Sequence, residues 1–365
     1  RPWWGFSLPC VSGSAKTRTC FLRAITYLQR SGLRRRCCSV FATGFSAPER
    51  RANLSSLRET RHSTKLILCL GTVYLVWGSS FIFTKIAVQN LPPALFAGTR
   101  FLTAGVLLTI IAGIYGRSHL PATWIEWRHV TVAGFFMVFV SNGLNTWAMQ
   151  YIPSNQSALL NGTSAFWIAG LGVFGRRGHP LTRSAVLGLV IGFIGAVLML
   201  IPKGPVFSKG SLAQLGVLTA CASWSLGTLY YRNINTQLSS MMFMALQMLM
   251  GGLMLLCLSL ARGDSMHGPP NAPGIIALCY LTFLSSGLAY TAYGWLTMNT
   301  TPALISTYSY VNPAIAAILG WLVLHEHLSG LQLVGMAIII IGVGILTLPG
   351  GSLTDPKTLA EPKTQ

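Results

Sequence analysis

The sequence predicts an all-α integral membrane protein with about ten transmembrane helices. Hydrophobic residues make up 52% of the 365 residues and charged residues only 9%, whereas a soluble domain carries roughly a quarter charged residues. The mean hydropathy is +0.56. A chain so poor in charge cannot cover a water-facing surface, which excludes an ordinary soluble enzyme and a disordered chain.

Consecutive apolar runs account for the predicted helices. Each is close to the roughly 20 residues that a helix needs to cross a bilayer, and backbone groups in lipid must be paired internally. The breaks are short and hold turn residues, as at Asn90-Leu91-Pro92-Pro93. The predicted spans are 66–88, 93–115, 130–151, 155–175, 184–202, 212–231, 240–261, 274–296, 302–324 and 330–348.

The net charge of +19 is concentrated near the N-terminus. Residues 1–65 hold 13 of the 26 basic residues and two of the seven acidic ones, and the other 300 residues carry a net charge of only +8. These later basic residues stand mostly between apolar runs and form no patch with interleaved aromatic side chains, so no nucleic-acid partner is expected. The expected surroundings are a lipid bilayer.

Residues 1–65 are predicted to form a basic extension outside the mature fold, and residues 349–365 a polar C-terminal tail. The first methionine is Met137. Residues 1–53 have three interpretations that stay open: translated upstream sequence, a targeting leader or a genuine basic tail. Four of the eight cysteines lie there and no Cys-x-x-Cys occurs, so no disulfide framework, metal site or other cofactor is predicted.

Basic residues in the breaks predict the orientation. They precede the first span and follow the second and fourth, while the breaks near Asn90 and Pro153 contain none. By the positive-inside rule both termini are expected in the cytoplasm, although Lys203, Lys209 and Arg262 fall on the side predicted to be outside. The basic residues on which this predicted orientation rests are Arg58, Arg61, Lys65, Arg117, Arg128, Arg176, Arg177 and Arg183.

The spans fall into two similar halves, 66–202 and 212–348, in which landmark residues recur at an offset of 147. Five helices per half is an odd number, so the second half enters the membrane upside down. Inverted repeats are typical of alternating-access transporters, whose solute site lies where the halves meet. The matching pairs are Trp77 with Trp224, Arg100 with Gln247, Gly105 with Gly252, Gly188 with Gly335, Gly195 with Gly342 and Pro202 with Pro349.

Two stretches carry motifs of a known family. The first is Val76-Trp77-Gly78-Ser79-Ser80-Phe81, with Lys85, Leu91-Pro92-Pro93 and Arg100-Phe101-Leu102. The second is Pro302-Ala303-Leu304-Ile305-Ser306, with Tyr310-Val311-Asn312-Pro313, Gly320-Trp321 and Glu326. As a set, they resemble the EamA family of the drug/metabolite transporter superfamily, most of all its YedA-like group of bacterial inner-membrane proteins.

The resemblance covers about 66–348 and implies ten helices in two EamA repeats. It also implies a multi-pass protein of the bacterial inner membrane that transports small metabolites, often by efflux of amino acids or related compounds. The chain departs from the family in one place. Family members often carry an acid after the fourth helix, and this region reads Phe174-Gly175-Arg176-Arg177-Gly178-His179-Pro180, so no role of a first-half acid is implied.

Two basic residues inside the spans are candidates for the transport path. Arg100 lies about eight residues past Pro92, which is roughly 12 Å from the helix end and too deep for free snorkelling. Its planar fork suits a carboxylate or phosphate, and the alternative is a structural arginine bound to helix-end carbonyls. Lys85 is near the outer end of the first span, where it either reaches the lipid headgroups or contributes to the path.

Small and aromatic residues recur at equivalent places in the halves. Trp77, Gly78 and Ser79 stand in the first span and Trp224 in the sixth. Glycine beside hydroxyls either lets helices approach closely or lets a solute near the backbone. The tryptophan pair is expected to wall a cavity on both sides, with Ser79 in the path and Gly78 at a hinge.

Buried amides need hydrogen-bond partners, and Gln247 and Asn312 are the amides we assign to the path. Pro313 follows Asn312 in mid-helix, where proline frees a carbonyl and kinks the helix, so a hinge and a polar contact are equally expected there. Further amides in the spans are Asn145, Gln150 and Asn161. The Gly188-x-x-x-Gly192 motif fits close helix packing within one chain or in a homodimer.

Glu326 is the one acid placed to carry a coupling proton, with a helix cap or ion pair as the alternative. His325 and His327 flank it, but helical neighbours two residues apart do not face each other, so no metal site is expected. The spans therefore predict a secondary transporter for a small metabolite with a carboxylate, such as an amino acid. The alternatives are a multidrug exporter of apolar cations, a membrane enzyme and a non-transporting scaffold, and no catalytic motif favours the enzyme.

Overall fold

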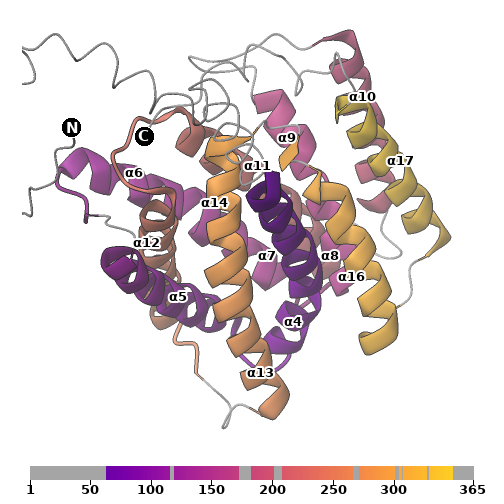
Figure 1. The fold of residues 1–365 in the computed structure, drawn as a ribbon. Helices are drawn as coiled ribbons and strands as arrows, with labels where there is room; N and C mark the ends of the chain where they lie inside the picture. The colour runs from indigo at the N-terminus through magenta and orange to yellow at the C-terminus, as the bar shows by residue number, and fades with distance from the viewer. Residues whose placement is uncertain are drawn as a thin grey trace, which may run out of the picture. The chain divides into compact units, whose positions relative to one another are not determined.

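The computed structural model describes residues 63–115, 119–171, 182–200, 208–265, 271–300, 304–305, 307–326 and 329–347, and every regular element in them is a helix (Figure 1). The chain divides into two compact units, Arg1–Thr64 and Lys65–Gln365. The labelled helices belong to the second unit. Residues 1–62 of the extension predicted at 1–65, and the tail predicted at 349–365, lie outside the described residues.

Six helices of the described chain are long and apolar enough to cross a membrane. At 22 to 28 residues each and about 1.5 Å per residue, they match or exceed the roughly 30 Å of a bilayer core. The all-helical membrane class is therefore confirmed. These helices are Ser63–Val88, Pro93–Ile114, Trp124–Ala148, Lys209–Asn233, Ser240–Ala261 and Ala272–Asn299.

The other predicted spans contain shorter helices. They are α8 (Ser154–Asn161), α9 (Ser164–Leu171), α10 (Arg183–Leu200), α16 (Tyr308–Leu324) and α17 (Gly330–Thr347). The count of ten membrane crossings stays a prediction. Within the long helices, the labels are η1 (Val73–Trp77), α4 (Gly78–Val88), α5 (Pro93–Tyr115), α6 (Trp124–Gly134), η2 (Phe135–Asn142), α7 (Gly143–Ala148), α11 (Lys209–Asn233), α12 (Ser240–Ala261), α13 (Ala272–Tyr280), η3 (Leu281–Ala289) and α14 (Tyr290–Asn299).

Two of the differences from the predicted spans have a visible structural cause or consequence. The third helix begins at Trp124 rather than at 130, because Thr123 caps it by accepting a hydrogen bond from the backbone N–H of Glu126. The fourth span is not continuous: a turn at Gly162 and Thr163 separates α8 from α9. A Cβ on Gly162 would lie 3.0 Å from the Ser309 carbonyl oxygen of α16, so the turn fits closely against the second repeat.

Three segments wind as π-helix, which periodicity did not predict. Two of them, η2 and η3, occupy equivalent places in the repeats, starting 146 residues apart at Phe135 and Leu281. Each is continued by an α-helix, α7 or α14, without a break in the chain. π-Helical turns occur frequently at functional sites. Here the extra residue per turn changes which side chains of the third and eighth predicted spans face the centre.

The repeats meet along two glycine-lined crossings. At the crossing of α5 with α12, a Cβ on Gly105 would lie 2.7 Å from the backbone nitrogen of Leu249, and one on Gly252 would lie 2.6 Å from that of Leu102. Glycine pairs that share an offset of 147 in the sequence thus allow each backbone to touch the other. The two helices cross at the lower left of Figure 1.

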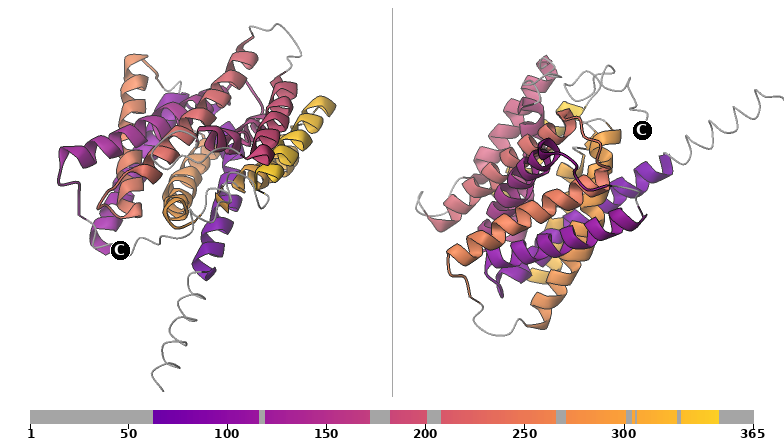
Figure 2. Two further views of the ribbon diagram at one scale, coloured as in Figure 1. Left: turned by 90° about the horizontal axis from the view of Figure 1, so that it is seen from above. Right: turned by 90° about the vertical axis from the view of Figure 1, so that its left-hand side faces the viewer.

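The second crossing joins α10 and α17, which lie side by side in Figure 1 and again in the left view of Figure 2. A Cβ on Gly195 would lie 2.8 Å from the Gly335 carbonyl oxygen, and one on Gly342 would lie 2.8 Å from that of Gly188. The glycine motif that begins at Gly188 therefore serves close packing within this chain.

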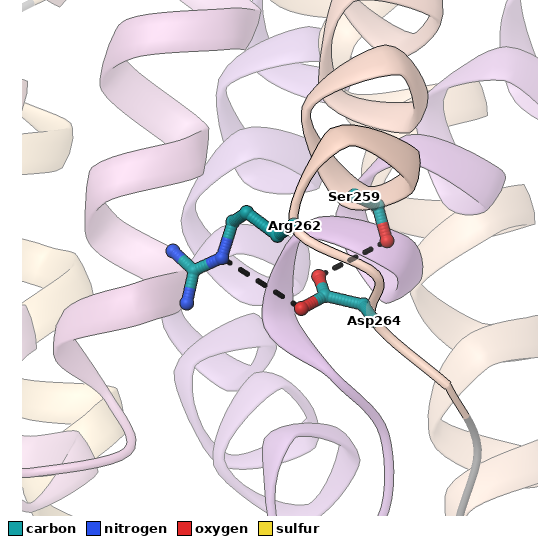
Figure 3. Close-up of polar contacts among 3 residues, drawn as sticks. All are labelled: Ser259, Arg262 and Asp264. Atoms are coloured by element: carbon teal, nitrogen blue, oxygen red, sulfur yellow. Dashed lines mark hydrogen bonds and ion pairs between the residues drawn. The ribbon is translucent and has the colours of Figure 1, made fainter.

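The C-terminal end of α12 is closed by a glycine and by polar contacts. Gly263 adopts a left-handed backbone with φ of 68°, and the Asp264 N–H donates to the Ser259 carbonyl. The Ser259 hydroxyl donates to Asp264 Oδ2 at 3.0 Å, and Arg262 Nε lies 3.7 Å from Asp264 Oδ1 (Figure 3). Capping by αL glycine is common at helix C-termini.

The glycine crossings predict a matched pair of stability effects. Gly252→Ala places a methyl group 2.6 Å from the Leu102 backbone, which forces α5 and α12 apart and costs about 1–3 kcal/mol. We expect thermal unfolding in detergent to shift down by several degrees. Gly113→Ala, on α5 with nothing within 4 Å of the new methyl group, is the control and should leave the transition unchanged or higher. Equal melting temperatures for both variants would contradict the tight crossing.

Candidate functional site

A cavity of about 100 Å³ lies at the centre of the second unit, and both repeats line it. The first repeat contributes side chains from η1, α4, α5, η2, α7, α8 and α9, and the second from α11, η3, α14 and α16. The lining residues are Trp77, Ser80, Phe81, Thr84, Arg100, Ser141, Asn142, Asn145, Thr146, Met149, Ala158, Asn161, Gly162, Ser164, Trp224, Ser285, Tyr290, Tyr308, Ser309, Asn312 and Pro313.

Arg100 is the charged residue of this lining. Its side chain is 5% exposed, and its Nε and Nη2 donate to the hydroxyl oxygens of Ser286 and Ser285 at 2.8 and 3.0 Å. Both serines belong to η3, so a π-helical turn of the second repeat holds a guanidinium of the first. The guanidinium also lies 4.6 Å from the centre of the Phe101 ring. No carboxylate pairs with Arg100 in the part of the chain that the structure describes.

Trp77 and Trp224 meet at the same cavity, with ring centres 5.5 Å apart in an edge-to-face arrangement. Tyr290 contacts both indoles, and Tyr308 lies edge-on to Trp77. The indole nitrogens donate to the Ser285 carbonyl at 3.4 Å and to the Tyr293 hydroxyl at 3.2 Å. The aromatic wall is thus fixed by its own hydrogen bonds as well as by packing.

Amides and hydroxyls form the rest of the polar lining. Asn145 and Asn161 exchange hydrogen bonds at 3.2 and 3.3 Å, and Ser157 donates to Asn145 at 2.8 Å. Asn312 and Ser309 differ from these residues. They are 5% and 3% exposed, and Asn312 Oδ1 and Ser309 Oγ have no hydrogen-bond partner among the described residues.

Pro313 lies inside α16 and has no N–H, so the carbonyl four residues earlier, that of Ser309, loses its helical donor. Gly78, the other residue assigned to a hinge, packs against this helix: a Cβ there would lie 2.8 Å from the Ile315 side chain. The two hinge residues therefore lie on neighbouring helices, α4 and α16, beside the cavity.

Lys85 is outside the cavity and caps a helix. Its Nζ donates to the Met149 and Ile152 carbonyls at 2.7 and 3.0 Å, where α7 ends. The second repeat has the same arrangement 147 residues later. Arg232 donates to the Thr297 and Thr300 carbonyls at 3.3 Å each, where α14 ends. A cation at a helix C-terminus offsets the partial negative charge there.

Glu326 also binds a helix end. Its carboxylate accepts from the backbone N–H groups of Ser154 and Asn155 at 2.8 and 3.1 Å and from the Ser154 hydroxyl at 2.8 Å. These groups form the N-terminus of α8, which a carboxylate stabilises. The expected helix-cap interpretation matches this geometry, and the carboxylate is not part of the cavity lining.

Two other residues assigned to the path lie away from the cavity. The Ser79 hydroxyl contacts the Leu75 carbonyl and the Tyr280 hydroxyl at 2.7 and 2.6 Å. Gln247 is fully buried beside Met244, with its Nε2 2.9 Å from the sulfur. Arg100 and Gln247 occupy equivalent positions in the two repeats, but of the two Arg100 alone lines the cavity.

Sequence reasoning missed the serines that hold Arg100 and the tyrosines of the aromatic wall. The repeat offset would have found Arg232, which stands 147 residues after Lys85. Nothing in the periodicity marked Ser285 and Ser286, because their facing depends on the π-helical turn η3.

Comparison with known proteins identifies the family. The EamA-like transporter family model matches residues 64–201 and 211–348. The chain is 30% identical to the "Uncharacterized inner membrane transporter YedA" of Escherichia coli over 84% of this chain and 97% of that protein. It is 27% identical to the "Uncharacterized transporter YvbV" of Bacillus subtilis over 77% of this chain and 90% of that one.

A solved crystal structure has the same fold, with a TM-score of 0.60 and 19% identity over 82% of this chain and 99% of that chain. The resemblance drawn from the motifs is confirmed, and so are the two EamA repeats. The chain is a membrane protein that belongs to the EamA-like transporter family.

Proposed function

We propose that this protein is a secondary transporter that carries small organic solutes with a carboxylate, such as amino acids, out of the cell across the bacterial inner membrane. The observation that carries the proposal is Arg100. A guanidinium that is 5% exposed lines a cavity between two inverted repeats, and its partners within the described residues are neutral hydroxyls.

The chemistry of a buried cation supports a carboxylate ligand. An unpaired charge in a low-dielectric site is costly, and a bound carboxylate would supply the missing countercharge. Arginine has five N–H donors, of which two bind Ser286 and Ser285. The remaining donors are compatible with the paired contacts that a guanidinium makes to a carboxylate.

The difference between the repeats supports alternating access. Thr146 lines the cavity, whereas Tyr293, 147 residues later, is fully buried in the aromatic cluster. The cavity extends along η1 and α4 from Trp77 to Thr84, so one of these two repeat-related positions faces the cavity and the other is packed among aromatic rings. In our proposal the repeats exchange these two arrangements, so the filled side opens when the cavity side closes.

The relatives named as transporters support transport rather than catalysis. With the predicted orientation, both termini are cytoplasmic and the cavity lies toward the outer ends of α4 and α7. The proposals of export and of an amino-acid solute come from the family resemblance. The proposal of a carboxylate on the solute comes from the buried guanidinium of Arg100.

Arg100→Gln tests the carboxylate site. The variant keeps a polar side chain but removes the charge, and hydrogen bonds to charged groups contribute about 1.5–3 kcal/mol. We expect binding of carboxylates, measured by calorimetry or ligand-dependent thermal shift on purified protein, to weaken by about 10–100-fold. Arg262→Gln, at an exposed site at the end of α12, should bind as the unaltered protein does. Unchanged affinity of Arg100→Gln would remove Arg100 from the site.

A second candidate is a multidrug exporter of apolar cations, which the wall of Trp77, Trp224, Tyr290 and Tyr308 favours because aromatic faces attract cations. This function needs a cavity acid. The nearest candidate by sequence, Glu326, instead binds the N-terminus of α8. Arg100 in the same cavity opposes a cationic ligand.

Glu326→Gln separates the two functions. Loss of a helix cap costs about 0.5–2 kcal/mol, so we expect a melting temperature lower by a few degrees and an unchanged order of solute affinities. Glu126→Gln removes a similar contact at the start of α6, where the carboxylate accepts from Ala122 at 2.9 Å, and is the control for the capping effect. Loss of resistance to cationic drugs in cells with Glu326→Gln alone would favour the multidrug function.

A further inference from the structure

We propose that the solute carries, besides its carboxylate, an uncharged hydrogen-bond donor such as a hydroxyl group, which binds Asn312 and Ser309. This inference rests on the proposed carboxylate site at Arg100. It assigns a second binding position in the same cavity, formed by Asn312 and Ser309 and called the second pole below. It narrows the proposed carboxylate class: a hydroxy acid is preferred over the amino acid of the same carbon skeleton, which the amino-acid class drawn from the family resemblance does not predict.

The second pole consists of two polar oxygens without hydrogen-bond partners among the described residues, one that only accepts (Asn312 Oδ1) and one hydroxyl (Ser309 Oγ). Asn312 and Ser309 line the cavity, are 5% and 3% exposed, and their Oδ1 and Oγ atoms have no hydrogen-bond partner in the described protein. Residues three apart on a helix lie on the same face, so the two oxygens of α16 are neighbours. Buried polar atoms normally have partners, and the cavity is where a partner can enter.

The backbone adds a third acceptor at the same place. Pro313 provides no N–H to the Ser309 carbonyl, and this oxygen lies 3.0 Å from the position of a Cβ on Gly162. The Asn312 amide oxygen and a carbonyl can only accept. Ser309 Oγ and the Asn312 amide nitrogen can donate as well. A hydroxyl group on the solute fits this set of atoms, because it donates to the oxygens that only accept and can accept from the Ser309 hydroxyl.

The other amides of the lining are already engaged. Asn142 donates to the Met137 carbonyl and the Tyr290 hydroxyl, and Asn145 and Asn161 bind each other. Recognition at the second pole therefore falls to α16 rather than to α7 or α8.

Charge decides between a hydroxyl and an ammonium group. The described lining holds one cation, Arg100, and no acid. A monoanion would leave the cavity neutral, whereas a zwitterion would leave the guanidinium and the ammonium group with one carboxylate between them. Burying an ammonium group against neutral acceptors alone is costly. A neutral donor satisfies the same oxygens without that cost.

The volume limits the size of the solute. The cavity measures about 100 Å³, which is of the order of the roughly 150 Å³ cavity that accommodates benzene. Short-chain acids with few carbon atoms fit this space. The position of the hydroxyl group along the carbon chain of the solute is varied in the experiment.

The experiment compares matched acids on the purified full-length protein in lipid nanodiscs. Butanoate is compared with its 2-, 3- and 4-hydroxy and its 2-, 3- and 4-amino derivatives by calorimetry. We expect one hydroxy acid to bind about tenfold more tightly than butanoate, the gain of a hydrogen bond to a buried acceptor. The amino acid with the same substitution pattern should bind more weakly than that hydroxy acid. Tighter binding of the amino acid would overturn the inference.

Variants locate the second pole. Asn312→Leu should remove the advantage of the hydroxy acid over butanoate, measured as the ratio of the two affinities. Asn312→Asp supplies the countercharge for an ammonium group and should reverse the order, so that the amino acid binds more tightly. Asn299→Leu, an exposed asparagine at the end of α14, should behave as the unaltered protein.

The two proposals fail in different ways. In one outcome, the hydroxy acid keeps its affinity advantage in Asn312→Leu while Arg100→Gln weakens the binding of every acid. This result overturns the second pole and leaves the carboxylate site supported. Equal affinity of all acids for Arg100→Gln and the unaltered protein overturns the carboxylate site. The ligand series on the unaltered protein needs no variant to fold, so it tests the inference even where a variant is unstable.

Discussion

Backbone-to-backbone contact between the two EamA repeats is the constraint on which the structure depends. Lipid offers no hydrophobic force that would hold apolar helices together, so close approach and van der Waals packing have to do so. Gly105 and Gly252 provide it between α5 and α12, and Gly195 and Gly342 between α10 and α17. The central cavity exists because these crossings hold the repeats together elsewhere while polar side chains meet between them.

The fold could be predicted largely from the sequence, because apolar length and repeat symmetry are directly readable. The glycine pairs at an offset of 147 are the points of contact, and Trp77, Trp224, Arg100 and Asn312 all reach one cavity. The direction in which other side chains point was not readable. In helices that are apolar on all sides, periodicity does not mark the inward face, so Ser79 and Gln247 could not be distinguished by sequence from the residues that line the cavity.

The partners of the charged residues required the structure. Arg100 depends on a π-helical turn that brings Ser285 and Ser286 to it, and no pattern in the sequence distinguishes that turn from ordinary helix. Lys85 binds backbone carbonyl groups at the end of α7, and Glu326 binds backbone N–H groups at the start of α8, where helical partners are missing. Their role as caps follows from where α7 ends and α8 begins, and helix ends are the least certain part of any sequence-based assignment.

The cationic caps have a mechanical consequence. Lys85 ties α4 to the end of α7, and Arg232 ties α11 to the end of α14, so the first and third helices of each repeat are clamped at one end. A rearrangement that preserves these hydrogen bonds moves the two helices of each pair together. In the proposed alternating access, the displacement then falls on the surfaces where the first pair of helices meets the second, as where α7 packs against α11.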